Sequence, residues 1–170
     1  MIRPTQQATI ADPRTSSRPF PWYCPKCRRK EVRPVVIFYR CEMAHDGRLH
    51  AVEVPELTVP RCGHCGELVF NEGAEAQVRR ALRSQLRQLM PDEIRAARTA
   101  LGLSQKDLAD RLGVTEATLS RWETESQLQP RAIDNLLRVF FALPEVRSIL
   151  VGAEQNPHLG AVGPFCHTDL

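Results

Sequence analysis

Four of the six cysteines in this 170-residue chain form two Cys-x2-Cys pairs. A two-residue spacer lets both thiolates of a pair face one metal ion, and two pairs complete the tetrahedral shell of a structural Zn²⁺ site. A closed shell of four thiolates leaves no position for water or substrate, so the metal is expected to hold a small domain together and not to catalyse a reaction. The sequence therefore predicts one structural Zn²⁺ ion per chain, with Cys24, Cys27, Cys62 and Cys65 as its ligands.

Other interpretations of the cysteines stay open at this point. Cys24 and Cys27 with Cys41 and His45 approximate the spacing of a ββα zinc finger, although that choice gives Cys62 and Cys65 no role. A redox dithiol would place one pair at the start of a helix in a thioredoxin-like context. Free cysteines also pack as small buried hydrophobes. The two matched pairs favour the four-cysteine site.

Composition narrows the class of protein. No stretch approaches the roughly 18 consecutive apolar residues that a membrane span needs, and the first residues do not resemble a signal peptide. The net charge of +3 permits a polyanionic partner, and residues 1–90 carry the excess, with 15 Lys and Arg against 9 Asp and Glu. We expect a cytoplasmic protein without a membrane partner, and no residue set suggests an enzyme.

The elements that position these groups change type along the chain. Apolar, β-branched stretches around Val35–Tyr39 and Val52–Val59 flank Asp46-Gly47, which predicts a β-hairpin between the cysteine pairs. From residue 72 onward the apolar residues recur at the spacing of an α-helix. The expected fold class is α+β, with these segments: a disordered tail (1–21), a zinc-binding β-rich domain (22–71), a linking helix (72–90), an all-α domain (91–150) and a flexible tail (151–170).

The sequence of the all-α domain predicts five short helices. Helix start signals occur at Pro91, Ser104, Thr115, Pro130 and Pro144, and Gly102 and Gly113 predict two of the helix ends. Two short helices joined by a glycine turn form the helix-turn-helix arrangement, in which the second helix enters the DNA major groove. A generic helical bundle is the alternative.

The residue string of this region favours DNA binding. Residues 103–114, Leu-Ser-Gln-Lys-Asp-Leu-Ala-Asp-Arg-Leu-Gly-Val, and residues 118–123, Thr-Leu-Ser-Arg-Trp-Glu, strongly resemble the Cro/C1 (Xre) family of DNA-binding domains. The resemblance covers residues 91–150. The sequence departs from the family after Glu123, where a left-handed glycine is usual. Glu125 would be strained there, which leaves a rebuilt turn as an alternative.

The resemblance implies which residues face DNA. Gln105 and Ser104 would lie against a phosphate, and Arg131 would clamp another from the fourth helix of the domain. Arg121 is the strongest base-reading candidate, because its guanidinium can donate twice to guanine. The alternatives are a solvated helix residue or a partner of Glu123 or Glu125. The implied DNA-binding set is Ser104, Gln105, Thr115, Glu116, Ala117, Thr118, Ser120, Arg121 and Arg131.

The order of the two halves resembles the zinc-finger and helix-turn-helix antitoxins of the MqsA (YgiT) type. This resemblance implies a homodimeric repressor that binds a double-stranded DNA operator, and a small ribonuclease toxin as the partner of the zinc domain. Ala117 departs from the polar base-reading residue expected at that position. A stand-alone Xre-family regulator and a zinc-ribbon adaptor for protein interactions are the alternatives.

Overall fold

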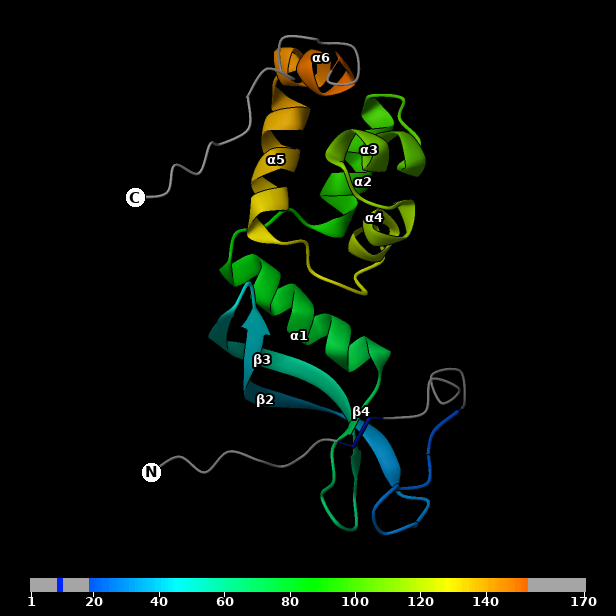
Figure 1. The fold of residues 1–170 in the computed structure, drawn as a ribbon. Helices are drawn as coiled ribbons and strands as arrows, with labels where there is room; N and C mark the ends of the chain where they lie inside the picture. The colour runs from blue at the N-terminus through cyan, green and yellow to red at the C-terminus, as the bar shows by residue number, and fades with distance from the viewer. Residues whose placement is uncertain (1–8, 11–18, 153–170) are drawn as a thin grey trace, which may run out of the picture.

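The structure, a computed structural model, describes residues 9–10 and 19–152 and has the predicted α+β class. A β-rich first half is followed by a helical second half (Figure 1). The elements are β1 (Thr9–Ile10), β2 (Val32–His45), β3 (Arg48–Cys62), β4 (Val69–Phe70), α1 (Glu72–Gln85), α2 (Pro91–Ala100), α3 (Gln105–Leu112), α4 (Glu116–Glu123), α5 (Arg131–Ala142) and α6 (Pro144–Gly152).

The predicted hairpin is confirmed by the antiparallel pair β2–β3. Its turn is Asp46-Gly47, with φ of 49° and 73°, and His45 pairs with Arg48 on either side. Two positive φ angles suit the twist of a two-residue hairpin turn, and Gly47 adopts one without steric cost. The register shifts between Ile37 and Tyr39, where the pairing is irregular.

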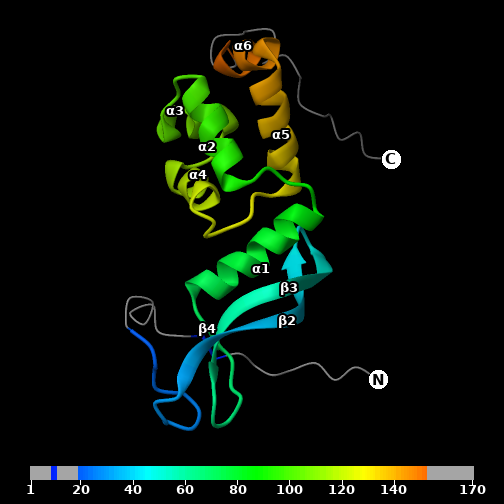
Figure 2. The same cartoon turned by 180° about the vertical axis from the view of Figure 1, so that it is seen from behind.

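Helix α1 covers one face of the hairpin (Figure 2). Val52 and Val54 of β3 and, beyond the irregular pairing, Leu57 and Val59 are buried in the core that α1 covers. Each pair follows the period of two of a strand that is covered on one side, and the irregularity between the pairs offsets that period by one residue. Leu128, which follows α4, packs into the same core and so links the two halves.

A second core holds the helical half together. Ile94, Leu108, Leu119 and Phe140 are fully buried, each from a different helix, and Trp122 packs among them. Side chains three and four residues apart share one helix face, which explains why these short helices converge on one centre. The five helices α2–α6 start where the sequence predicts.

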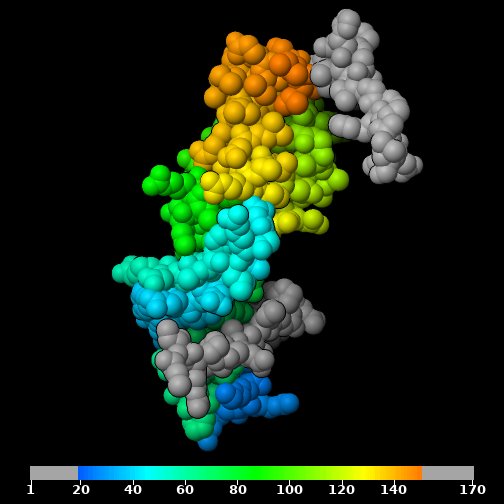
Figure 3. Space-filling view, turned by 60° about the vertical axis from the view of Figure 1, so that its left-hand side comes forward, coloured from blue at the N-terminus to red at the C-terminus, as the bar shows by residue number. Residues whose placement is uncertain are grey.

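Helix α1 lies between the hairpin and the helical half in both ribbon views (Figures 1 and 2). The space-filling view shows the cysteine-bearing loops and the helical half at opposite ends of an elongated molecule (Figure 3). The hairpin turn touches the helical half directly, because the Asp46 carboxylate accepts a 2.7 Å hydrogen bond from the backbone N–H of Arg131.

Three expectations need correction or comment. β1 lies inside the segment expected to be a disordered tail and pairs in parallel with β4, so that expectation is wrong at Thr9–Ile10. The remaining calls on residues 1–8, 11–18 and 153–170 lie outside the described residues. The helix expected over 72–90 ends at Gln85.

Among the described residues, no helix has the length and apolar character needed to cross a membrane.

Candidate metal centre and DNA interface

The sulfurs of Cys24, Cys27, Cys62 and Cys65 lie within 4.8 Å of one another. Cys24 Sγ is 3.5 Å from Cys65 Sγ, and Cys27 Sγ is 3.6 Å from Cys62 Sγ. A tetrahedron with metal–sulfur distances of about 2.3 Å has edges of about 3.8 Å, so this spacing fits one four-coordinate ion and is far too long for disulfides. The cluster can bind a metal ion.

The two loops that present these sulfurs have the same backbone geometry. In the first, Cys24 N–H donates to Arg29 O at 2.8 Å and Arg28 N–H donates to Cys24 O at 2.9 Å. In the second, Cys62 N–H donates to the carbonyl of Glu67 at 2.9 Å, and Gly66 N–H donates back to Cys62 O at 3.0 Å. The residue four positions after the first cysteine has positive φ in both loops, 60° at Arg28 and 74° at Gly66.

Polar groups favour the thiolate form of Cys62 in particular, whereas at Cys27 the hydrogen bond from the backbone N–H of Arg29 is outweighed by burial and the neighbouring cysteines, which raise the pKa to about 12. The backbone N–H of Cys65 contributes most to lowering the pKa of Cys62; burial opposes this effect, and the N–H of His64 adds to it, with a net pKa of about 7. Lys26 Nζ forms an ion pair with Glu67 at 3.1 Å beside the cluster, and Arg29 contacts His64 at 3.2 Å. The Lys26 ammonium also interacts electrostatically with Cys65 and Cys24, so it would offset part of the negative charge of their thiolates.

The ββα-finger alternative is contradicted by the fold. Residues 32–45 form strand β2 and no helix, and Cys41 pairs with Val52 within the hairpin and packs on its core. Its sulfur is absent from the metal-competent groups found among the described residues. His45 ends β2 and contacts Gln88 and Asp46. Neither cysteine pair lies at the start of a helix, so the redox alternative lacks the geometry that lowers thiol pKa in thioredoxin-like sites.

Helices α3 and α4 form the helix-turn-helix. The Ser104 hydroxyl accepts from Asp107 N–H at 3.0 Å, and the Asp107 carboxylate accepts from Ser104 N–H at 3.0 Å, which closes a capping box at the start of α3. Gly113 ends α3 in the left-handed conformation, with φ of 69°. Thr115 caps α4 by accepting from Thr118 N–H at 3.2 Å, and the two hydroxyls lie 2.8 Å apart.

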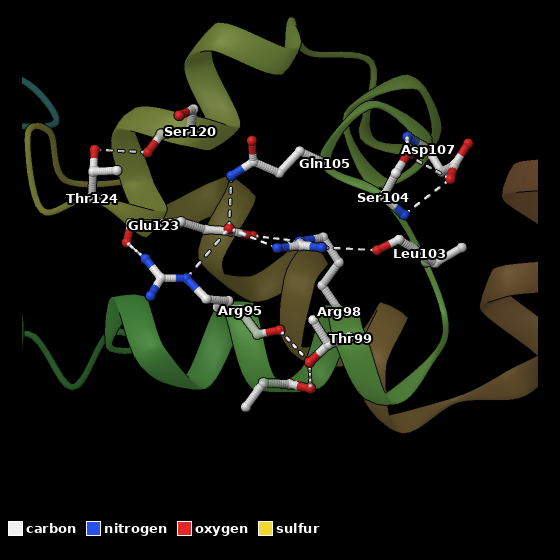
Figure 4. A network of polar contacts seen from close by, with 11 residues as sticks. Arg95, Arg98, Thr99, Leu103, Ser104, Gln105, Asp107, Ser120, Glu123 and Thr124 are labelled. Carbon is white, nitrogen blue, oxygen red and sulfur yellow. Dashed lines mark hydrogen bonds and ion pairs between the residues drawn. The ribbon is translucent and has the colours of Figure 1, made fainter.

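The last residue of α4, Glu123, is buried to 2% exposure and organises the helix-turn-helix from inside (Figure 4). Arg98 of α2 donates to both carboxylate oxygens, at 2.7 and 2.9 Å, and Gln105 Nε2 donates to one of them at 2.9 Å. Arg95 donates to the Glu123 carbonyl at 2.5 Å. These contacts tie α2, the start of α3 and the end of α4 together.

The Glu123 carboxylate is held in its ionised form. Burial acts to raise the pKa of Glu123, but the hydrogen bonds from Arg98 and Gln105 and the charges of Arg98 and Arg95 outweigh it and leave the pKa below its usual range. A buried carboxylate with a bidentate guanidinium partner meets the conditions under which a buried ion pair is tolerated.

The structure brings the predicted DNA-facing residues of α4 to one surface but gives two others internal contacts. Glu116, Ala117 and Arg121 are exposed, and Ser120 is half-buried. The side-chain amide nitrogen of Gln105 donates to the Glu123 carboxylate (Figure 4). This nitrogen is therefore engaged inside the protein and does not face a phosphate. Arg131, expected to clamp a phosphate, has an exposed side chain, and it is its backbone N–H that donates to Asp46 of the hairpin turn.

The side chain of Arg121 has no hydrogen-bond or ion-pair partner among the described residues. Its proposed alternatives, Glu123 and Glu125, are occupied by arginines of α2 and α1, respectively. An exposed guanidinium on the second helix of a helix-turn-helix, with no internal role, is available to donate to a base edge or a phosphate.

Sequence reasoning missed the structural role of Glu123. The signal was present, because Leu119, Trp122 and Glu123 are spaced so that all three share the inward face of one helix, where a carboxylate requires a cationic partner. Its partner Arg98, 25 residues away, could not be identified from that spacing.

The fold and these contacts define a helix-turn-helix protein with a four-cysteine cluster. Residues 94–144 match the family described as HTH_3, helix-turn-helix, which supports assignment of this region as a Cro/C1-type DNA-binding domain. No curated protein matches the chain.

Proposed function

We propose that this protein is a sequence-specific DNA-binding transcriptional repressor. The observation that carries the proposal is the exposed, unpartnered Arg121 on α4 within a helix-turn-helix that Glu123 holds together. Gln105 would act through the backbone N–H groups at the start of α3, because Glu123 engages its side-chain amide. Arg131 would act through its exposed guanidinium, because Asp46 engages its backbone N–H. No catalytic role is proposed for any residue.

The repressor is proposed to act as a homodimer on a palindromic operator whose half-sites lie about one helical turn apart. Exposed apolar side chains support a dimer surface on α5, α6 and their junction, because Val139, Leu143 and Ile149 are 41%, 45% and 59% exposed. Large apolar side chains that stay exposed on neighbouring elements suit an interface with a partner.

The four cysteines are proposed to hold one structural Zn²⁺ ion per chain. The sulfur spacing and the set of four thiol ligands fit zinc, which commonly occupies four-coordinate sulfur sites of this kind. The ion would fix the loops that close the distal end of the hairpin, where Trp22, Val32 and Val69 form a small core around the cysteines.

DNase footprinting on the DNA upstream of the protein's own gene tests the proposed repressor. We expect protection of a short palindrome by the full-length, metal-loaded chain and weaker protection by Arg121→Ala. Uniform binding along the fragment, with no protected site, would refute sequence-specific repression there.

A protein partner of the hairpin is a second proposal, the one implied by the antitoxin resemblance. It is supported by large apolar side chains on the strands, where Val36, Phe38 and Leu49 are 64%, 60% and 70% exposed. A small ribonuclease toxin is the proposed partner. Affinity purification from native cells with mass spectrometry tests it: a small protein recovered at equal stoichiometry and toxic when expressed alone supports the antitoxin role. A bare homodimer would favour the stand-alone regulator.

A further inference from the structure

The turn that leaves the DNA-reading helix contains a residue in an unfavourable backbone conformation. Glu125, two residues after the end of α4, has φ of 63°. The left-handed region favours glycine, because a Cβ atom there approaches the backbone and strains it. The left-handed turn is therefore retained with a glutamate in place of glycine, and it needs contacts from outside the turn to hold it.

Those contacts come from α1, in the other half of the protein. Arg79 Nε donates to the Glu125 carbonyl at 2.7 Å, and the Arg79 side chain is 16% exposed. Arg80 forms an ion pair with the Glu125 carboxylate. One guanidinium thus fixes the backbone of the left-handed residue, and the next fixes its side chain.

The same helix holds the chain beyond Glu125. Arg83 of α1 is fully buried, and its Nη2 donates to the Gln127 carbonyl at 3.1 Å and to Gln129 Oε1 at 3.3 Å. Leu128 packs into the core between α1 and the hairpin. Two adjacent turns of α1 therefore clamp the segment that connects α4 to α5.

The clamp acts on the end of α4 that carries Arg121. The Gln127 N–H donates back to the Arg121 carbonyl at 3.2 Å, so the clamped segment closes directly on the base-reading residue. A shift of this turn would tilt the last turn of α4, and binding would then have to restore the competent orientation at a cost in affinity.

We propose that Arg79 and Arg80 are positioning residues for DNA recognition. They keep Glu125 left-handed, and through it they set the orientation of Arg121. The inference rests on the proposed DNA-binding function and adds that the half bearing the cysteines supplies part of the DNA-reading geometry.

Two substitutions at one position isolate this role. Glu125→Ala and Glu125→Gly remove the same charge and the same contact with Arg80, but only glycine adopts positive φ without strain. With full-length, metal-loaded protein and a selected operator duplex, we expect Glu125→Gly to bind within about twofold of the native chain. Glu125→Ala should bind about three- to tenfold more weakly. Equal dissociation constants for the two variants would overturn the proposal.

The roles of Arg79 and Arg80 are tested in the native chain and in the Glu125→Gly chain. Arg79→Ala with Arg80→Ala should weaken operator binding in the native chain but have little effect in the Glu125→Gly chain, where the turn no longer needs the clamp. Equal losses in both backgrounds would show that the arginines touch DNA themselves or act only on folding, and would overturn the positioning role.

Hydrogen exchange of the Gln127 amide gives a readout independent of DNA. Exchange should be faster in Glu125→Ala and in the double arginine variant than in Glu125→Gly, since the bond to the Arg121 carbonyl depends on the turn. Unchanged exchange in all three would overturn the clamp. A native chain that binds no DNA sequence specifically would refute the proposed function, whereas specific binding with equal Glu125→Ala and Glu125→Gly affinities would refute only this inference.

Discussion

The guanidinium of Arg98 donates two hydrogen bonds, of 2.7 and 2.9 Å, to the carboxylate of Glu123 in the interior of the helix-turn-helix. Glu123 is buried, and the Arg98 side chain is 11% exposed. Removal of one member of a buried pair leaves the other charge without compensation. The pair therefore couples the fold of the helical half to the placement of α4.

We expect Glu123→Ala to lower the free energy of unfolding of the helical half by about 3 kcal/mol or more. The cost comes from Arg98 and Gln105 losing their shared acceptor. Urea unfolding followed by tryptophan fluorescence in a Trp22→Phe background, where Trp122 is the remaining tryptophan, measures it. The control is Asp110→Ala, which removes an exposed ion pair with Lys106 and should change stability little. Equal effects of the two substitutions would contradict the internal role of Glu123.

The lowered pKa of Glu123 predicts an acid-sensitive contribution to stability. A carboxyl group with a folded pKa below its unfolded value of about 4.3 binds more protons when unfolded, so its stabilisation is complete above that value and is lost as the pH falls toward the folded pKa. The stability difference between the native chain and Glu123→Gln should therefore shrink below about pH 4.3. A difference independent of pH between 3 and 7 would contradict this linkage.

Much of this arrangement could be predicted from the sequence because its signals are local. Cysteine spacing identifies the metal-competent cluster, Asp46-Gly47 identifies the hairpin turn, and capping residues identify the helix starts. The contacts of Glu125 could not be predicted in this way. Arg79 and Arg80 lie 46 and 45 residues from it, and only the packing of α1 against the connecting segment brings them together.

The contact of Gln105 and the strand β1 could not be predicted for the same reason, because both depend on residues that are distant in the sequence. A glutamine at a helix start is expected to face a phosphate, but the buried Glu123 carboxylate is a stronger acceptor within reach and engages its amide nitrogen. β1 has two residues, too few to give an alternating pattern, and its pairing with β4 spans about 60 residues.

Metal analysis checks the cysteine cluster. We expect one Zn²⁺ per chain in the native protein, loss of the ion in Cys62→Ser and its retention in Cys41→Ser, because Cys41 belongs to the hairpin core. Inductively coupled plasma mass spectrometry on dialysed protein measures the ratio. Retention of the ion in Cys62→Ser, or its loss in Cys41→Ser, would contradict the assignment of ligands.

The matched geometry of the two cysteine loops gives a backbone prediction. Arg28 occupies the position that Gly66 fills in the other loop, so Arg28→Gly should be tolerated or should stabilise the site, whereas Gly66→Ala should weaken it by about 1 kcal/mol. A Cβ at Gly66 would also lie 3.4 Å from the Arg61 guanidinium. Competition with a chromophoric chelator measures the metal affinity of each variant. Weaker binding by Arg28→Gly than by Gly66→Ala would show that the loops are not equivalent.

Selection of bound duplexes from a random DNA pool tests the central claim most directly, namely that α4 reads a base sequence through Arg121. The full-length, metal-loaded native chain should enrich a palindrome with half-sites about one helical turn apart. Arg121→Ala should bind that site about 1 to 3 kcal/mol more weakly and lose preference at one base of each half-site. Arg40→Ala, a charge-matched change in the hairpin, should enrich the native motif. Failure of the native chain to enrich any sequence, or enrichment of the identical motif by Arg121→Ala, would contradict the account.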